Sequence, residues 1–451
     1  MRLPAPPCPV GEPVLTDPIP GATVPETTPN DPSASSAEAA DGLRPLDDVT
    51  VIEIDSWMAA PSASAILADL GATVVKVEPL GGDPMRGSSR SVRLGDDADE
   101  ARRTYDYQFD VANRGKQSIA VALDTEPGRD VVRNLCRRAQ VFVCNLLAHR
   151  QERFGLDPES ILAVNPGIVH ATLSGYGTIG PESLRPGYDV TAFFARSGLY
   201  DAMREGEDGV VPMARPAQGD YTTGLAFVST ILSALRLAER SGRGQVVETS
   251  LYETAVWTQA SDYAITAIDQ RPLRPRDRQH QVVATMNRYP CGDGRWIVVN
   301  MPQESAWPLF CRTLDREEWL DDERFATVRS RFQQMPDLVT AIDAAMAART
   351  RDEWGKIFDD VGIIWGPVLG LHEVVTDAQA DAVGLFPELE HPAIGSYPTV
   401  ASPLRFATAE VRPRTPAPAL GADTHRVLVA AGYSDDEIDA LVETGAVHVT
   451  G

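Results

Sequence analysis

The chain has 451 residues, of which 43% are hydrophobic, and a formal net charge of −23 at pH 7. This length favours two domains over a single core. The negative charge argues against nucleic acid and anionic membranes as partners, so an anionic ligand would need a local basic pocket.

The cysteines and the N-terminal segment bear on the compartment. The five cysteines are odd in number, widely spaced and contain no C-x-x-C pair, which is typical of a reducing cytoplasm and indicates neither a disulfide framework nor a metal site. Residues 1–45 are rich in Pro, Ser, Thr, Ala and acids and predict a disordered tail. The N-terminus has no apolar signal region, and no uncharged apolar stretch reaches membrane-spanning length. We therefore expect a cytoplasmic protein without a membrane partner.

From residue 46 the chain predicts alternating strands and helices. The predicted strands are 49–54, 73–77, 118–123, 141–145, 168–173 and 245–249, and helices are predicted at 61–70, 127–139 and 158–164. Strands joined by helical crossovers are parallel, so the first domain is predicted to be α/β with a mostly parallel sheet. The loop 56–61 lacks G-x-G-x-x-G, which argues against NAD-dependent hydride transfer.

Asp220 stands at the start of a long uncharged segment that runs from Tyr221 to Leu235. Apolar residues recur there at three- and four-residue steps, which predicts a helix with a buried face. An ionised acid is favoured at the N-terminus of a helix. The simplest structural interpretation is that Asp220 caps this helix by accepting bonds from the next backbone amides.

Seven motifs, in order and at consistent spacing, indicate more than a cap. They are Leu67–Glu78, Gly82-Asp-Pro with Arg86, Asn113–Lys116, Gly175–Pro181, Gly187-Tyr-Asp189, Gly219-Asp220 and Gly242–Gln245. Together they make the chain resemble the family III CoA-transferases, a group that includes formyl-CoA and carnitine CoA-transferases and the α-methylacyl-CoA racemases. The similarity runs from about Leu46 to the C-terminus.

The resemblance implies a Rossmann-like large domain that is interrupted by a smaller α+β domain. The implied boundaries are 46–265 and 395–451 for the large domain, 285–385 for the small domain, and 266–284 and 386–394 for the linkers. It also implies an interlocked homodimer, in which two subunits pass through each other like linked rings.

The resemblance also assigns the chemistry. The aspartate at the position of Asp220 is the family's nucleophile: it attacks an acyl-CoA thioester, forms an acyl-aspartyl anhydride and releases CoA thiolate, and CoA passes finally to a carboxylic acid acceptor. An aspartate of ordinary pKa, about 3.9, is already ionised and needs no base. Coenzyme A is therefore expected as part of the substrate, with no permanently bound cofactor.

Ten further positions are implied as contacts of the CoA thioester. They are Met58, Ala59, Val121, Leu123, Asp124, Asn145, Arg153, Gly187, Tyr188 and Asp189. Structural alternatives stay open, because Asn145 also suits a helix cap, Arg153 a surface position and Val121 a strand core. The segment 146–150 departs from the family's aromatic and basic pattern, at the place where the family's phosphate contacts lie.

Two other functions remain as alternatives. A racemase needs a second acid/base group, and its branch of the family has histidine where this chain has Tyr188, whose ordinary pKa near 10 makes it a poor proton shuttle. His149 and His170 lie outside that motif. The other alternative is a CoA-binding protein without turnover. The motifs favour the transferase.

Overall fold

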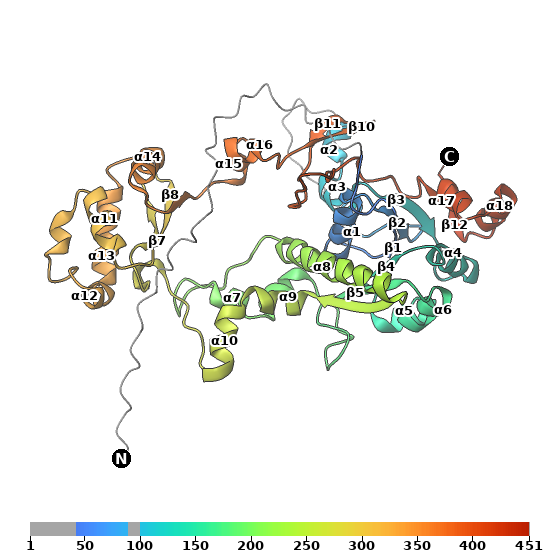
Figure 1. The fold of residues 1–451 in the computed structure, drawn as a ribbon, viewed down its shortest axis with the longest axis horizontal. Helices are drawn as coiled ribbons and strands as arrows, with labels where there is room; N and C mark the ends of the chain where they lie inside the picture. Colours follow the sequence, from blue (N-terminus) through green and yellow to red (C-terminus); the bar gives the residue numbers. More distant parts are fainter. Residues whose placement is uncertain (1–41, 89–99, 451) are drawn as a thin grey trace, which may run out of the picture. The chain divides into compact units, whose positions relative to one another are not determined.

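The computed structural model describes residues 42–88 and 100–450, and a seven-stranded sheet is its largest element (Figure 1). Its order is β12-β3-β2-β1-β4-β5-β6. The strands are β1 Thr50–Ile54, β2 Thr73–Glu78, β3 Gln117–Val121, β4 Val141–Cys144, β5 Val169–Ser174, β6 Gln245–Ser250 and β12 Val447–His448. All pairs are parallel except β12 with β3. The mostly parallel sheet is confirmed, and six strands have the 3-2-1-4-5-6 order of dinucleotide-binding sheets.

The sheet is buried on both faces because successive side chains of a strand point to opposite sides. On β4, Val141 and Val143 belong to one apolar cluster, and Phe142 and Cys144 belong to the other. Helices cover each face, so the arrangement is a three-layer α/β/α sandwich.

The helices on the two faces come from separate parts of the chain. The first cluster contains residues of α1 Ala59–Asp69, the π-helix η1 Asp189–Ala195, α7 Leu199–Ala202, α8 Gln218–Ser241 and α9 Leu251–Thr258. The second contains residues of α4 Glu126–Cys136, α5 Ala148–Phe154, α6 Pro158–Val164, α17 Thr424–Ala430 and α18 Asp435–Glu443. The last strand, β12, thus completes a sheet whose other strands all precede residue 251, and the C-terminal helices α17 and α18 help to cover one of its faces.

The α1 and α8 helices lie side by side over the sheet (Figure 1). A Cβ atom on Gly224 would stand 2.3 Å from Ser62 Oγ and 3.1 Å from the Ala59 carbonyl oxygen, so glycine permits this close approach. In the described part of the chain, α8 is also the one helix long and apolar enough to cross a membrane by length and composition alone. Its buried side chains, among them Phe227 and Ile231, pack into the α/β/α core.

Residues 286–367 contain a second sheet with its own apolar cluster. Its antiparallel strands are β7 Met286–Pro290, β8 Trp296–Asn300 and β9 Trp365–Pro367. Its helices include α11 Ala306–Thr313, α12 Val328–Gln333, α13 Met335–Met346 and α14 Arg351–Val361, followed by α15 Leu371–Val375 and α16 Ala378–Ala382.

The predicted domain boundaries stay predictions. Part of the predicted linker 386–394 forms β10 Glu388–His391, which pairs with β11 Gly395–Pro398. This hairpin packs against tyrosines beside α3 Tyr107–Asn113, which follows α2 Glu100–Thr104. Most of the predicted disordered tail lies outside the described residues, which begin at residue 42.

Candidate active site

Asp220 lies in the first turn of α8 but does not cap it. The N-cap residue is Ala217, at φ 80°, and no side chain of its own caps the helix. The carboxylate of Asp189 takes that role from another segment: its Oδ2 accepts from Ala217 N at 2.5 Å, and Gly219 N–H also donates to it. The N-cap interpretation of Asp220 is therefore wrong, and in the described residues its carboxylate accepts no hydrogen bond.

The environment of Asp220 makes its carboxylate harder to ionise than expected. Burial, together with the charge of Asp189, raises the pKa of Asp220 to about 7. Burial also raises the pKa of Asp189, against the effect of the backbone N–H groups that donate to it. The expectation of an ordinary pKa is thus wrong, and Asp220 titrates near neutrality. A desolvated, unpaired carboxylate at a cavity is typical of functional sites.

The side chain of Asp220 lines a cavity of about 250 Å³, here called the Asp220 pocket. Its walls follow the carboxyl ends of three neighbouring parallel strands, β1, β4 and β5, where ligands of doubly wound sheets bind. They include Ser56, Trp57, Ala59, Asn145, Leu146, Leu147, Arg150, Ser174, Gly175, Arg185, Gly187 and Tyr188.

The charge of the Asp220 pocket differs from that of the whole chain. Arg150 and Arg185 line it, and Asp220 is the one acidic side chain among its described lining residues. The guanidinium of Arg185 also pairs with Glu182 at 2.6 Å. In a chain of net charge −23, these two guanidinium groups are the cationic side chains that the pocket offers to an anionic ligand.

The structure brings five of the predicted site residues together. Ala59, Asn145, Gly187, Tyr188 and Asp220 all line the Asp220 pocket. The Asn145 side chain accepts from Ser56 N at 3.2 Å and donates to Ser56 O at 2.8 Å. It therefore ties the loop after β1 to the end of β4, instead of capping the helix that follows.

The other predicted residues lie outside this pocket. Met58 lines a separate cavity of about 720 Å³. Asp189, the first residue of η1, is buried against the N-terminus of α8. The remaining four are Val121, buried in β3, Leu123 and Asp124 just after it, and Arg153, exposed on α5. Since β2 separates β3 from β1, contact with those at β3 would need an extended ligand. Their roles stay predictions.

Sequence reasoning missed several residues of the pocket wall, among them Trp57, Arg150 and Arg185. Trp57 has φ 67°, an uncommon left-handed conformation for a bulky residue, and its ring meets Tyr188 edge-on at 5.6 Å. No sequence signal for that conformation exists in Ser56-Trp57-Met58. Arg150 lies in the segment that departs from the family pattern, and its basic character was the available signal.

The two histidines considered for a racemase, His149 and His170, do not line the Asp220 pocket. His170 is fully buried in β5, with Nε2 3.0 Å from the Leu156 carbonyl oxygen and its ring against Phe142. Burial lowers the pKa of this imidazole, as expected for a core histidine.

Comparisons with known proteins agree with this geometry. The chain is 29% identical to (R)-2-hydroxy-4-methylpentanoate CoA-transferase of Clostridioides difficile, covering 89% of this chain and 99% of that one. It is also 29% identical to succinyl-CoA:glutarate CoA-transferase of Mus musculus, over 90% and 91% of the two chains. The crystal structure of a CAIB/BAIF family protein from Brucella suis superposes with a TM-score of 0.75 at 27% identity, covering 86% of this chain and 99% of that one. The sequence profile of CoA-transferase family III matches residues 46–424, so the chain belongs to CoA-transferase family III and is an enzyme of that class.

Proposed function

We propose that this enzyme moves CoA from an acyl-CoA thioester to a carboxylic acid, with Asp220 as the nucleophile. One observation carries the proposal: the Asp220 carboxylate is relieved of capping by Asp189 and opens into a pocket at the carboxyl ends of the strands. A carboxylate without a capping bond keeps its lone pairs for attack on a carbonyl carbon.

The chemistry proceeds through covalent aspartyl intermediates. The Asp220 carboxylate attacks the thioester carbonyl, and the C–S bond breaks to release CoA thiolate and leave a mixed acyl-aspartyl anhydride. Thiolate then attacks the aspartyl carbonyl, so the donor acid leaves and an aspartyl-CoA thioester remains. The acceptor carboxylate attacks the carbonyl of this thioester, the C–S bond breaks, and a second anhydride forms between Asp220 and the acceptor. The released thiolate then attacks the acceptor carbonyl of this anhydride, which gives the acceptor acyl-CoA and regenerates the Asp220 carboxylate. Both anhydrides hydrolyse readily, so the pocket must exclude water.

The raised pKa of Asp220 fits this sequence of steps. Desolvation destabilises the ionised carboxylate before reaction and so makes it a stronger nucleophile. The fraction that is ionised at neutral pH is about half, by its pKa of about 7. No separate base is needed, because the carboxylate itself carries the reacting electron pair.

The polar residues of the pocket suit an anionic CoA thioester. We assign Arg150 and Arg185 to the phosphate groups, since guanidinium groups bind phosphate oxygens in pairs. We also assign Ala59, Gly187 and Tyr188, which line the same pocket, to the arm of the ligand that carries the thioester. The predicted contacts at Val121–Asp124 and Arg153 are kept for the distal end of the ligand.

The acceptor is proposed only as a carboxylic acid. Two relatives are named for different acids, one a branched 2-hydroxy acid and one a dicarboxylic acid. This variety argues that the family's shared residues handle CoA and the aspartyl chemistry, while other residues select the acid.

The test compares wild type with Asp220→Asn, which removes the nucleophile while Asp189 still caps α8. Purified protein is incubated with succinyl-CoA or acetyl-CoA and a panel of acids, and new thioesters are measured by mass spectrometry. We expect transfer by wild type and loss of at least 1,000-fold in the variant, which retains the fold. Equal transfer by both proteins would refute the nucleophile. Epimerisation of a 2-methylacyl-CoA without an acceptor would support a racemase, and CoA binding without turnover would support a binding protein.

We also propose that the enzyme is an interlocked homodimer of the cytoplasm. Large apolar side chains are exposed on α9 and α10 Ala260–Asp269: Trp257 is 78% exposed, Ile265 66% and Ile268 86%. Exposed apolar surface of this kind marks an interface. Light scattering should give twice the chain mass of 48.8 kDa; a monomer would contradict the dimer. The four described cysteines are unpaired, as a reducing compartment permits.

A further inference from the structure

Five charged side chains form a fully buried cluster that contacts the loop after β1, here called the lysine cluster; Ser56 and Trp57 of that loop line the Asp220 pocket. It consists of Glu53, Asp55, Lys76, Asp83 and Lys116, all with side chains 0% exposed. Buried charges on this scale are costly unless they are paired and hydrogen-bonded. Nothing in the transfer chemistry uses them.

Lys76 is the centre of this cluster. Its Nζ lies 2.9 Å from Asp55 Oδ1, 3.0 Å from Asp83 Oδ2 and 3.5 Å from Glu53 Oε1. It also donates to the Asp55 carbonyl oxygen at 3.3 Å. Burial alone would lower the pKa of Lys76, but the surrounding carboxylates outweigh it and raise the pKa, so the ammonium stays charged.

Asp83 connects this ammonium to the pocket wall. While its Oδ2 faces Lys76, its Oδ1 accepts from Met85 N at 2.9 Å and from Trp57 N at 3.3 Å. The two residues therefore bind the loop after β1 on both sides of Ser56, Lys76 through Asp55 and Asp83 through Trp57. Asn145 binds Ser56 itself.

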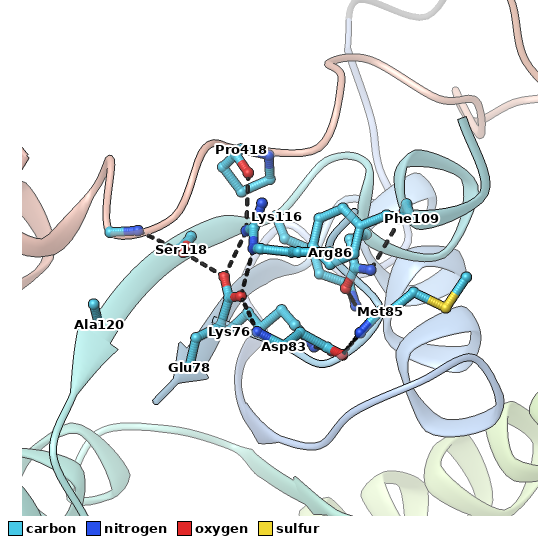
Figure 2. Close-up of polar contacts among 12 residues, drawn as sticks. Lys76, Glu78, Asp83, Met85, Arg86, Phe109, Lys116, Ser118, Ala120 and Pro418 are labelled. Carbon is cyan, nitrogen blue, oxygen red and sulfur yellow. Dashed lines mark hydrogen bonds and ion pairs between the residues drawn. The ribbon is translucent and has the colours of Figure 1, made fainter. Parts of the chain in front are cut away.

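The turn that presents Asp83 is fixed from its other side. Asp83 N donates to Glu78 Oε2 at 3.0 Å, and Arg86 donates to both oxygens of Glu78, at 2.6 and 2.7 Å. Ser118 Oγ donates to Glu78 at 2.6 Å as well (Figure 2). The Asp83 carboxylate is thus a rigid attachment point for the backbone of Trp57.

Trp57 needs such an attachment point. Its φ of 67° is a left-handed conformation that L-residues with large side chains avoid unless their surroundings impose it. This conformation brings the indole edge-on to Tyr188, and both rings line the Asp220 pocket. Relaxation of Trp57 to negative φ would move the indole from the wall that it shares with Tyr188.

We propose that Asp83 and Lys76 are positioning residues of the CoA-thioester pocket, which hold Trp57 in its left-handed conformation and so set the Trp57–Tyr188 wall beside Asp220. The inference rests on the proposed function for its kinetic readouts. The wall orients the thioester and keeps water from the aspartyl anhydride. Loss of either residue therefore lowers kcat/KM for the acyl-CoA and increases hydrolysis relative to transfer.

The test is a double-mutant cycle of Asp83→Ala and Trp57→Ala in the full chain. Asp83→Ala alone should lower kcat/KM for the acyl-CoA on the order of 10- to 100-fold, the size expected from a misplaced binding wall. If Asp83 acts through Trp57, adding Asp83→Ala to Trp57→Ala should cause little further loss. Fully multiplicative losses, or an unchanged kcat/KM in Asp83→Ala, would overturn the proposal.

Two matched variants separate positioning from general destabilisation. Asp83→Asn keeps an oxygen that can accept from Trp57 N, so it should retain more activity than Asp83→Ala; equal losses would contradict the role of this hydrogen bond. Asp69→Ala removes another buried ion pair, Asp69 Oδ2 with Arg114 Nη2 at 2.8 Å, at the opposite end of α1. It should lower thermal stability without changing the ratio of hydrolysis to transfer. If it changes that ratio as much as Asp83→Ala does, the effect is general and the proposal fails.

A binding measurement keeps this inference distinct from the nucleophile assignment. The dissociation constant for free CoA is measured by calorimetry in wild type and in each member of the cycle. Coupling of Asp83 and Trp57 in CoA affinity supports the positioning role even if Asp220→Asn proves active. If the losses from Asp83→Ala and Trp57→Ala are independent in both CoA affinity and kcat/KM, so that they multiply in the double variant, the positioning role is refuted. This holds whether or not Asp220 is the nucleophile. If Asp83→Ala does not fold, the same cycle is run with Asp83→Leu, whose side chain has a similar shape but offers no acceptor to Trp57 N.

Discussion

Asp220→Asn should make the protein more stable as well as inactive, and the gain should grow with pH. The folded-state pKa of Asp220 is about 7, whereas an unfolded aspartate has a pKa of about 3.9. A raised folded pKa gives stability that is fully present below about 3.9 and is lost as pH rises through about 7. At pH 8 the wild type therefore carries the full penalty of an ionised, desolvated carboxylate, and the amide of asparagine carries none.

The size of this penalty follows from the two pKa values. At about 1.4 kcal/mol per pKa unit, the difference sets an upper bound of about 4 kcal/mol. Water at the mouth of the pocket screens the charge, so we expect about 1–2 kcal/mol, or a few degrees in Tm.

Thermal unfolding of both proteins at pH 5 and pH 8, at one scan rate, measures the effect. The steric and hydrogen-bonding consequences of the amide are the same at both pH values, so they cancel in the comparison. The Tm advantage of Asp220→Asn should be larger at pH 8 than at pH 5. The same Tm difference at both pH values would refute the argument that burial raises this pKa. Asp83→Asn provides a contrast, because it removes a buried carboxylate that is paired with Lys76.

Three further measurements test the site. The kcat/KM of wild type should rise with pH through about 7 as Asp220 ionises, about tenfold per pH unit below that value. Asp189→Asn keeps an acceptor for the α8 amides but removes the neighbouring charge, so it should move this pH profile to lower pH. A kcat/KM that does not change from pH 5 to 8 would contradict both expectations. Gly224→Ala should lower stability by about 1–3 kcal/mol through overpacking against α1, measured by chemical denaturation; an unchanged midpoint would show that the helices can separate at no cost. Arg150→Ala should raise KM for acyl-CoA about tenfold with little change in kcat. Arg153→Ala, which alters an exposed residue of the same helix outside the pocket, should raise this KM less. A larger increase in Arg153→Ala than in Arg150→Ala would assign the phosphate contact to Arg153.

The sequence predicted the parallel sheet because each βαβ crossover leaves a local record. Strands such as Val141–Cys144 are continuous apolar runs, and helical periods separate them. The seven motifs also singled out Asp220, and four of the predicted contact positions, Ala59, Asn145, Gly187 and Tyr188, line the same pocket.

What the chain could not indicate is the partner of each polar group. An acid before an apolar helix predicts an N-cap, and α8 lacks that cap because Asp189 approaches from 28 residues earlier in the chain. Burial in the folded chain, together with the charge of Asp189, raises the pKa of Asp220, which composition and spacing leave at its ordinary value. Likewise, Lys76 and Asp83 were visible only as letters of family motifs, and the link from Asp83 to Trp57 spans 26 residues.

The sequence by itself therefore determined the order of strands and helices along the chain and the family, and it singled out the carboxylate that we propose as nucleophile, since these depend on local periodicity and on motifs read along the chain. The tertiary structure alone decided which carboxylate caps α8, which is free to react, and which backbone is held in a left-handed conformation at the pocket. Those outcomes depend on hydrogen bonds and charges between segments far apart in the chain, such as Asp83 with Trp57 and Asp189 with Ala217, and a linear pattern does not encode those distances.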